Sequence, residues 1–159
     1  MINRKFTKYR GLRSQDIKVF DMKKYEGLDV SSSFKELANT QEGIQKIIAW
    51  CNGIGSEVGF WGNLTYHLIP NTIWFLDVTA CSDIHDIDYN YPIKFATREE
   101  ALKFKTDADL RLYNNLVAYI KMNTTNSWLL SMRLRRAKIY YEIVSNAGNQ
   151  SFLDGKTIG

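Results

Sequence analysis

Apolar positions recur at helical spacing through most of the chain after residue 30. Two short stretches begin with residues that favour helix caps, at Ser31–Ser33 and at Thr40. The first predicts a short helix that turns Phe34 and Leu37 inward. The second predicts a helix that ends near Asn52 and carries a row of isoleucines on one face, namely Ile44, Ile47 and Ile48.

The middle of the chain combines a glycine-rich stretch with a further helical pattern. Residues 53–70 hold closely spaced glycines and are predicted to form a functional loop. From about Thr72 to Tyr89 the apolar spacing favours a helix, which Pro92 ends. The run of apolar residues 74–76 leaves a strand at the start of this segment as an alternative.

Two longer helices are predicted after Pro92. Thr97 and Glu100 form a capping box, and the helix that it opens is predicted to run, with a break, to about Met122. Asp109 occupies a position on the apolar face of this helix, together with Leu102, Leu112, Leu116 and Ile120. The last helix is predicted from Ser127 to about Asn146, with core candidates Leu130, Leu134, Ile139 and Ile143.

These elements predict a mainly α protein with one helical domain at residues 31–148. A basic arm at residues 1–30 precedes the domain, and a loose tail at 149–159 follows it. A chain of 159 residues, 45% of them hydrophobic, is long enough to enclose one core. The four tryptophans are predicted to anchor the core or an interface rather than to contact a membrane: Trp50, Trp61, Trp74 and Trp128.

Charge is distributed unevenly and narrows the choice of partners. Between residues 1 and 24 there are eight Lys or Arg against two Asp, whereas residues 77–109 hold eight acids against four bases. The arm therefore fits an anionic partner, and the middle fits a cation. No nucleic-acid-binding motif accompanies the charge, so a nucleic-acid partner is not expected. We expect neither a signal peptide nor a transmembrane segment, because no apolar run has the required length or place.

The candidate chemistry lies in the stretch that contains one of the two histidines, His85. Cys81 and Tyr89 stand four residues before and after it, so the three side chains would form one ridge on a helix. Asp86 would lie about 100° round from that ridge. A histidine and a carboxylate in this arrangement can hold a water and a metal side by side. A disulfide between Cys81 and Cys51 remains possible on the sequence alone.

A helical Cys-x-x-x-His-Asp-x-x-Tyr followed by an acid on a later helix resembles the phospholipase A2 superfamily. The resemblance implies an antiparallel helix pair at the centre of the fold. It also implies that His85 activates a water, that Asp86 binds calcium, and that Tyr89 and Asp109 orient the His85 ring. Asp109 is preferred to Asp107 because only Asp109 shares the face of Leu112 and Leu116. A cation with oxygen ligands would stabilise an ester oxyanion, and a carboxylate would fix the far N–H of the imidazole.

The calcium loop of that family is the part that this sequence does not reproduce. In place of Tyr-x-Gly-x-Gly the chain has Phe60-Trp61-Gly62-Asn63, and the disulfides of the secreted enzymes are missing. Gly62 is the loop position that would supply a carbonyl to Ca²⁺. The departure favours a protein that keeps the fold with little or no catalysis, and the His-Asp-Tyr-Asp set favours an active calcium-dependent phospholipid hydrolase.

The layout is also similar to a set of uncharacterised phage-borne proteins. The shared order is an Ile-Pro-x-x-x-Trp motif at residues 69–74, the His85–Tyr89 motif, Ala108-Asp109, and an Arg-x-x-x-Tyr-Tyr motif at residues 136–141 followed by Gly148. The resemblance implies a phage or prophage protein in the virion or the host cytoplasm. Its expected partners are other virion proteins or copies of itself, with phospholipid as a possible substrate.

Two other interpretations of the same residues stay open. His67, His85-Asp86 and Asp109 stand in the order used by metal phosphohydrolases that bind a transition metal through imidazole and carboxylate ligands. His85 could instead be a purely structural histidine that is hydrogen-bonded to Asp109.

Overall fold

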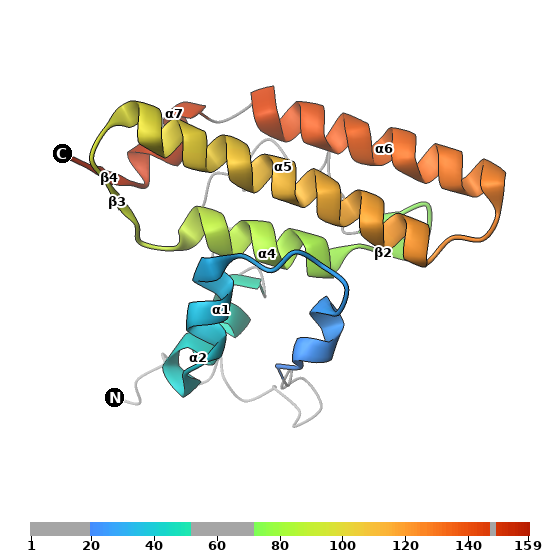
Figure 1. Cartoon of the computed structure of the whole chain (residues 1–159), viewed down its shortest axis with the longest axis horizontal. Helices are drawn as coiled ribbons and strands as arrows, with labels where there is room; N and C mark the ends of the chain where they lie inside the picture. The colour runs from blue at the N-terminus through green and yellow to red at the C-terminus, as the bar shows by residue number, and fades with distance from the viewer. Residues whose placement is uncertain (1–19, 52–71, 147–148) are drawn as a thin grey trace, which may run out of the picture.

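The protein is mainly helical (Figure 1). The computed structural model describes residues 20–51, 72–146 and 149–159. Their elements, in chain order, are η2 (Met22–Tyr25), α1 (Ser32–Ala38), α2 (Gln41–Cys51), β1 (Thr72–Ile73), β2 (Leu76–Asp77), α4 (Thr79–Asn90), β3 (Lys94–Phe95), α5 (Arg98–Met122), α6 (Ser127–Asn146), α7 (Asn149–Asp154) and β4 (Thr157–Ile158).

Helix α4 is the middle layer of the described fold. It packs on α1 and α2 through one side and on α5 through the other, and α6 covers the far side of α5. Figure 1 shows that α4 and α5 run antiparallel, as do α5 and α6. On the α1–α2 side the contacts are apolar and include Ala80, Ile84 and Ile87 of α4. On the α5 side Cys81 packs against Leu112 and Leu116.

The predicted helix over 72–89 begins seven residues later than expected, because a hairpin precedes it. Strands β1 and β2 pair antiparallel, with Ile73 opposite Leu76, and Trp74 and Phe75 form the two-residue turn between them. Both turn residues have positive φ, 46° and 65°, which an L-residue with a bulky side chain adopts at a cost of roughly 1–2 kcal/mol. The alternative of a strand at the start of this segment is therefore what the structure contains.

Helix α5 follows its sequence prediction at both ends but has no break. The Thr97 hydroxyl accepts a hydrogen bond from the backbone N–H of Glu100, and the Glu100 carboxylate accepts one from the backbone N–H of Ala96. The helix then continues unbroken to Met122, 25 residues in all. Ser31 and Thr40 likewise cap α1 and α2, as the sequence predicts.

The buried face of α6 differs from the predicted one. Ala137, Tyr140 and Val144 are buried, whereas Ile139 is exposed and the predicted leucines are only partly covered. Arg133 is buried as well. The sequence prediction favoured the residues with the largest apolar side chains, but the close approach of α5 and α6 is filled by an alanine and a tyrosine.

Segments at both ends of the predicted domain also contribute to the core. In the described part of the predicted arm, Tyr25 is buried against α1. In the segment predicted to be a loose tail, α7 buries Phe152 and Leu153 against α5, and β4 pairs parallel with β3. Residues 149–159 are therefore packed rather than loose in their first half, since these two side chains form an apolar cluster with Phe95 and Ala101.

Gly43 fixes the tight contact between α1 and α2. A Cβ built on Gly43 would lie 2.0 Å from the carbonyl oxygen of Leu37, well inside van der Waals contact. The backbone N–H of Gly43 also donates to Thr40, the cap of the same helix. A side chain of any size would therefore push α2 away from the end of α1.

Gly43→Ala tests this contact. In most helix interiors the change stabilises by about 1 kcal/mol. Here we expect a loss of about 1–3 kcal/mol, because the methyl group collides with backbone. Urea unfolding followed by circular dichroism measures the change. Gln45→Ala, exposed on the same helix, is the matched control and should stay close to wild type. A Gly43→Ala protein as stable as wild type would contradict the proposed contact.

Candidate active site

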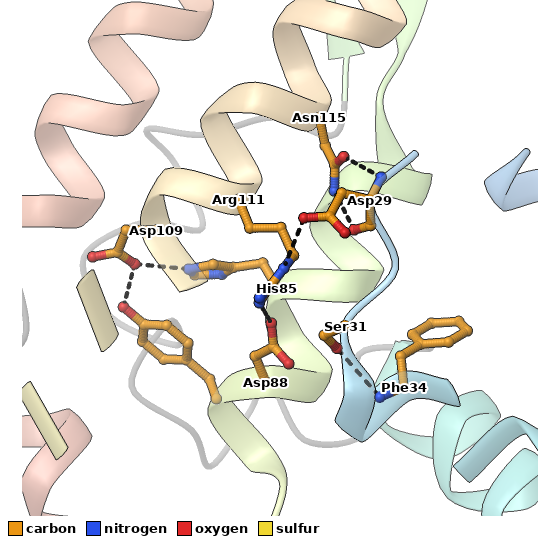
Figure 2. Close-up of polar contacts among 9 residues, drawn as sticks. Asp29, Ser31, Phe34, His85, Asp88, Asp109, Arg111 and Asn115 are labelled. Atoms are coloured by element: carbon orange, nitrogen blue, oxygen red, sulfur yellow. Dashed lines mark hydrogen bonds and ion pairs between the residues drawn. The ribbon is translucent and has the colours of Figure 1, made fainter. Parts of the chain in front are cut away.

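The α4–α5 interface brings the predicted histidine and aspartate together. The Nε2 atom of His85 lies 2.9 Å from Oδ1 of Asp109, and both side chains are buried. The Tyr89 hydroxyl donates to the same oxygen at 2.6 Å. Figure 2 shows the His85 ring directed from α4 towards Asp109 on α5. The predicted ridge of Cys81, His85 and Tyr89 thus faces α5 along its whole length.

The structure distinguishes Asp109 from Asp107. Asp109 is buried under α4, whereas Asp107 is exposed and pairs with Lys103 on the surface of α5. The apolar periodicity of α5 predicts this difference, because Asp109 is the acid that shares the face of Leu112 and Leu116.

Lys105 is a member of the site that the sequence analysis missed. Its ammonium donates to Oδ2 of Asp109 at 2.8 Å and to the backbone carbonyl of Val144 in α6 at 3.2 Å. Only 2% of Lys105 is exposed. The sequence does contain an indication of this contact, because Lys105 stands four residues before Asp109 on one helix, and side chains at that spacing are neighbours.

Asp109 is therefore an ionised buried carboxylate. Burial alone would raise its pKa, but the hydrogen bonds and charge that it receives from His85, Lys105 and Tyr89 outweigh burial and hold the pKa below its ordinary value. The same carboxylate, together with burial, raises the pKa of Tyr89, so the phenol stays protonated and donates.

An ionised Asp109 fixes the orientation and tautomer of His85. A carboxylate accepts hydrogen bonds only, so in the neutral imidazole the proton sits on Nε2 and the lone pair sits on Nδ1. The Tyr89 ring lies against the His85 ring, 4.2 Å between centroids, and limits its rotation. A histidine held in this way can accept a proton at Nδ1 while Asp109 stabilises the imidazolium.

Asp86, next to His85, differs from the other acids of α4. It is half-buried, and no hydrogen bond or ion pair to its carboxylate is found within the described residues. Burial, and then the nearby Asp83 carboxylate, raise the pKa of Asp86 to about 7. A partly covered carboxylate without a cationic partner is of the right chemical type to hold a hard cation.

The remaining acids of α4 are committed to other contacts. Asp83 accepts from Lys24 and from the Tyr25 hydroxyl of η2. Asp88 pairs with Arg111 at 2.6 Å, and its second oxygen, Oδ1, is buried with no hydrogen-bond partner in the part of the chain that is described.

The partners of Asp88 extend to the segment before α1. Arg111 also contacts the carboxylate of Asp29 at 3.3 Å. Figure 2 shows Asn115 and Asp29 in a reciprocal pair, where the Asn115 amide accepts from the N–H and donates to the C=O of Asp29. This network joins the segment that enters α1 to the middle of α5.

The other predicted residues are placed as follows. Cys81 and Cys51 are both free thiols, and burial raises the pKa of Cys81 to about 12, so it is not a reactive thiolate. Gly62, the predicted calcium-loop residue, and His67, the predicted phosphohydrolase ligand, lie outside the described residues. Within those residues no group of three or more His, Cys, Asp or Glu side chains is arranged to hold a metal ion.

Comparison of the chain with protein-family models, with curated proteins and with solved structures gave no match. In the portions of the chain that are described, no helix combines the length and the apolar character needed to cross a bilayer.

Asp109→Asn tests whether the buried carboxylate holds the site together. The change leaves the Lys105 ammonium buried without a counter-charge, and we expect a loss of about 3–5 kcal/mol in unfolding free energy. Asp107→Asn removes an exposed pair of the same spacing on the same helix and should cost about 0.5 kcal/mol or less. Chemical denaturation measures both variants.

A double variant separates loss of charge balance from loss of hydrogen bonds. Lys105→Met with Asp109→Asn removes both buried charges and should recover part of the stability lost in Asp109→Asn alone. Equal stability of the Asp109→Asn and Asp107→Asn proteins would show that the buried pair contributes no more to the unfolding free energy than the exposed pair.

Asp86→Asn tests the raised pKa of Asp86. Below pH 4 the carboxyl is protonated in both the folded and the unfolded chain and contributes nothing. Between pH 4 and 7 the unfolded chain loses this proton first, so this group lowers stability as pH rises, and the effect is complete above pH 7. Asp86→Asn should therefore gain about 1–3 kcal/mol over wild type at pH 8 but not at pH 4. Denaturation in EDTA measures this difference, and a pH-independent difference would contradict the shift.

Proposed function

We propose that this protein is a calcium-dependent hydrolase of phospholipid esters, similar to the phospholipase A2 superfamily in the use of a histidine and an aspartate on two antiparallel helices. The observation that carries the proposal is the shared Asp109 oxygen, which accepts from His85 and from Tyr89. Asp86, whose carboxylate has no hydrogen-bond or ion-pair partner among the described residues, follows His85 directly in the sequence.

Each residue has a defined task in this proposal. His85 takes a proton from water at Nδ1 as the water attacks the ester carbon, and it later returns a proton to the departing alkoxide. Asp109 does not exchange a proton; it positions the ring and stabilises the imidazolium. Tyr89 holds Asp109 and the ring in register.

Asp86 is the described residue that would hold calcium. Calcium, when bound, would supply positive charge for the ester oxyanion. A single carboxylate does not fill the six to eight oxygen positions that calcium takes. The remaining ligands would come from backbone carbonyls and waters, for which the sequence suggests the loop that contains Gly62.

A second function is favoured by a separate observation. His85 is 3% exposed, and Lys105 already neutralises the carboxylate that would support it. These features suit a protein that keeps the helix pair as a scaffold, with the His85–Asp109 bond as internal support. In that case the protein is a phage virion or assembly component without turnover.

Calcium binding and phospholipid hydrolysis, measured on one set of variants, separate these functions. For the hydrolase we expect calorimetry to give a calcium dissociation constant of about 1 μM to 1 mM, with binding lost in Asp86→Asn and kept in His85→Gln. We also expect hydrolysis of mixed phospholipid micelles that requires calcium. Both variants should lower the hydrolysis rate by about 10²-fold or more.

Asp107→Asn is the control for a simple loss of one negative charge, and it should bind calcium and hydrolyse lipid like wild type. Absence of calcium binding and of hydrolysis in the wild-type protein would overturn the hydrolase. If, in addition, His85→Ala lowers the melting temperature, the result supports the scaffold function.

A further inference from the structure

The hairpin before α4 places its two turn residues in an unusual environment. Phe75 is 97% exposed, and Trp74 is 46% exposed. Both adopt the left-handed conformation that two-residue hairpin turns require, for which asparagine and glycine are the usual residues. The chain therefore keeps two aromatic residues at a site where they are conformationally disfavoured and largely outside the core.

Arg133 holds this turn in place. Its guanidinium donates to the carbonyl of Trp74 at 2.7 Å and to the hydroxyl of Thr124 at 2.8 Å. The turn is thus attached to the segment between α5 and α6. A rigid, anchored turn presents its side chains without the entropy loss that a mobile loop would suffer on binding.

More exposed apolar side chains lie in the elements that meet at this turn. Met122 at the end of α5 is 56% exposed, and Trp128 in the first turn of α6 is 67% exposed. In Figure 1 the β1–β2 hairpin, the end of α5 and the start of α6 gather at one end of the molecule. We call Trp74, Phe75, Met122 and Trp128 the aromatic end.

Exposed cations lie near the aromatic end along the chain. Residues 110–141 contain no Asp or Glu and six Lys or Arg, of which Arg111 pairs with Asp88 and Arg133 is buried. Lys121 is exposed one residue before Met122, and Arg135 is exposed in α6. Asp77, in the second strand of the hairpin, accepts a hydrogen bond from the N–H of Thr79.

We propose that the aromatic end binds the surface of an anionic lipid membrane, with Phe75 and Trp74 inserted among the headgroups and the nearby cations on anionic lipid phosphates. Tryptophan and phenylalanine on a protruding turn suit the boundary between headgroups and acyl chains, and basic residues beside them add attraction to anionic lipid. The proposal goes beyond the hydrolase, since it needs neither His85 nor calcium.

A protein partner fits this surface less well. Stable protein interfaces bury about 800 Å² on each partner around a packed centre. A two-residue turn whose Phe75 stands almost fully in solvent offers a convex point rather than such a face. A lipid surface accepts a convex point, because headgroups and acyl chains rearrange around it.

The test is co-sedimentation of the full chain with vesicles of phosphatidylcholine containing phosphatidylglycerol, in EDTA. Trp74→Asn with Phe75→Gly is the informative variant, because Asn-Gly is the preferred sequence for this turn. We expect at least a tenfold loss of vesicle binding with a melting temperature equal to or above that of wild type. Leu110→Gln, an exposed apolar residue of α5 three turns before Met122, is the matched control and should bind like wild type.

The outcomes are distinct from those of the hydrolase test. Binding that weakens in pure phosphatidylcholine and in high salt, and that persists in His85→Gln, supports the membrane proposal even if no hydrolysis is found. Unchanged binding in the Asn-Gly variant overturns it. A wild-type protein that ignores vesicles also overturns it. The proposal is also overturned if the wild-type protein self-associates through the turn, so that only the Asn-Gly variant is a monomer.

Discussion

The contacts of one buried carboxylate, Asp109, hold three helices of the structure together. One oxygen accepts from His85 and Tyr89 of α4, and the other accepts from Lys105 of its own helix. Lys105 in turn donates to the carbonyl of Val144 in α6. An unpaired charge at this depth would cost several kcal/mol, so the ammonium and the carboxylate each depend on the other. The orientation of the His85 imidazole is fixed because the ring is hydrogen-bonded to this carboxylate, whose charge Lys105 balances.

This constraint also explains how a helix as polar as α4 can occupy the middle of the fold. Besides the Cys81 thiol, three of its buried side chains carry ionisable groups. Asp83 contacts η2, whereas His85 and Asp88 contact Asp109 and Arg111 of α5. Asp86 is the exception, with a raised pKa and no such partner among the described residues. Among the described residues, the lack of a partner separates Asp86 from Asp83 and Asp88.

Periodicity predicts the parts of this architecture that are set locally. The helix caps, the ends of α5 and α6, and the choice of Asp109 over Asp107 follow from spacing of three and four residues. What depends on distant partners was not predictable in the same way. The buried face of α6 is decided by how closely α5 approaches, and the burial of Phe152 depends on a cluster built from residues about 50 positions earlier. The resemblance to phospholipase A2 remains a proposal, because geometry at one helix pair does not establish a family.

The two sides of α4 differ in how they are attached, and this has a consequence for local opening. The α1–α2 side is held by apolar packing, with Ala80, Ile84 and Ile87 against Phe34, Leu37 and Ile47. The α5 side is held by the charged pair as well. Cooperative units defined by native-state amide exchange follow such boundaries. We therefore expect α1 and α2 to open as one unit, once the contacts of Asp29 with Arg111 and Asn115 break, while α4, α5 and α6 stay closed. The hydrogen bond between His85 and Asp109 would survive that event, and Asp83 and Asp86 would gain solvent.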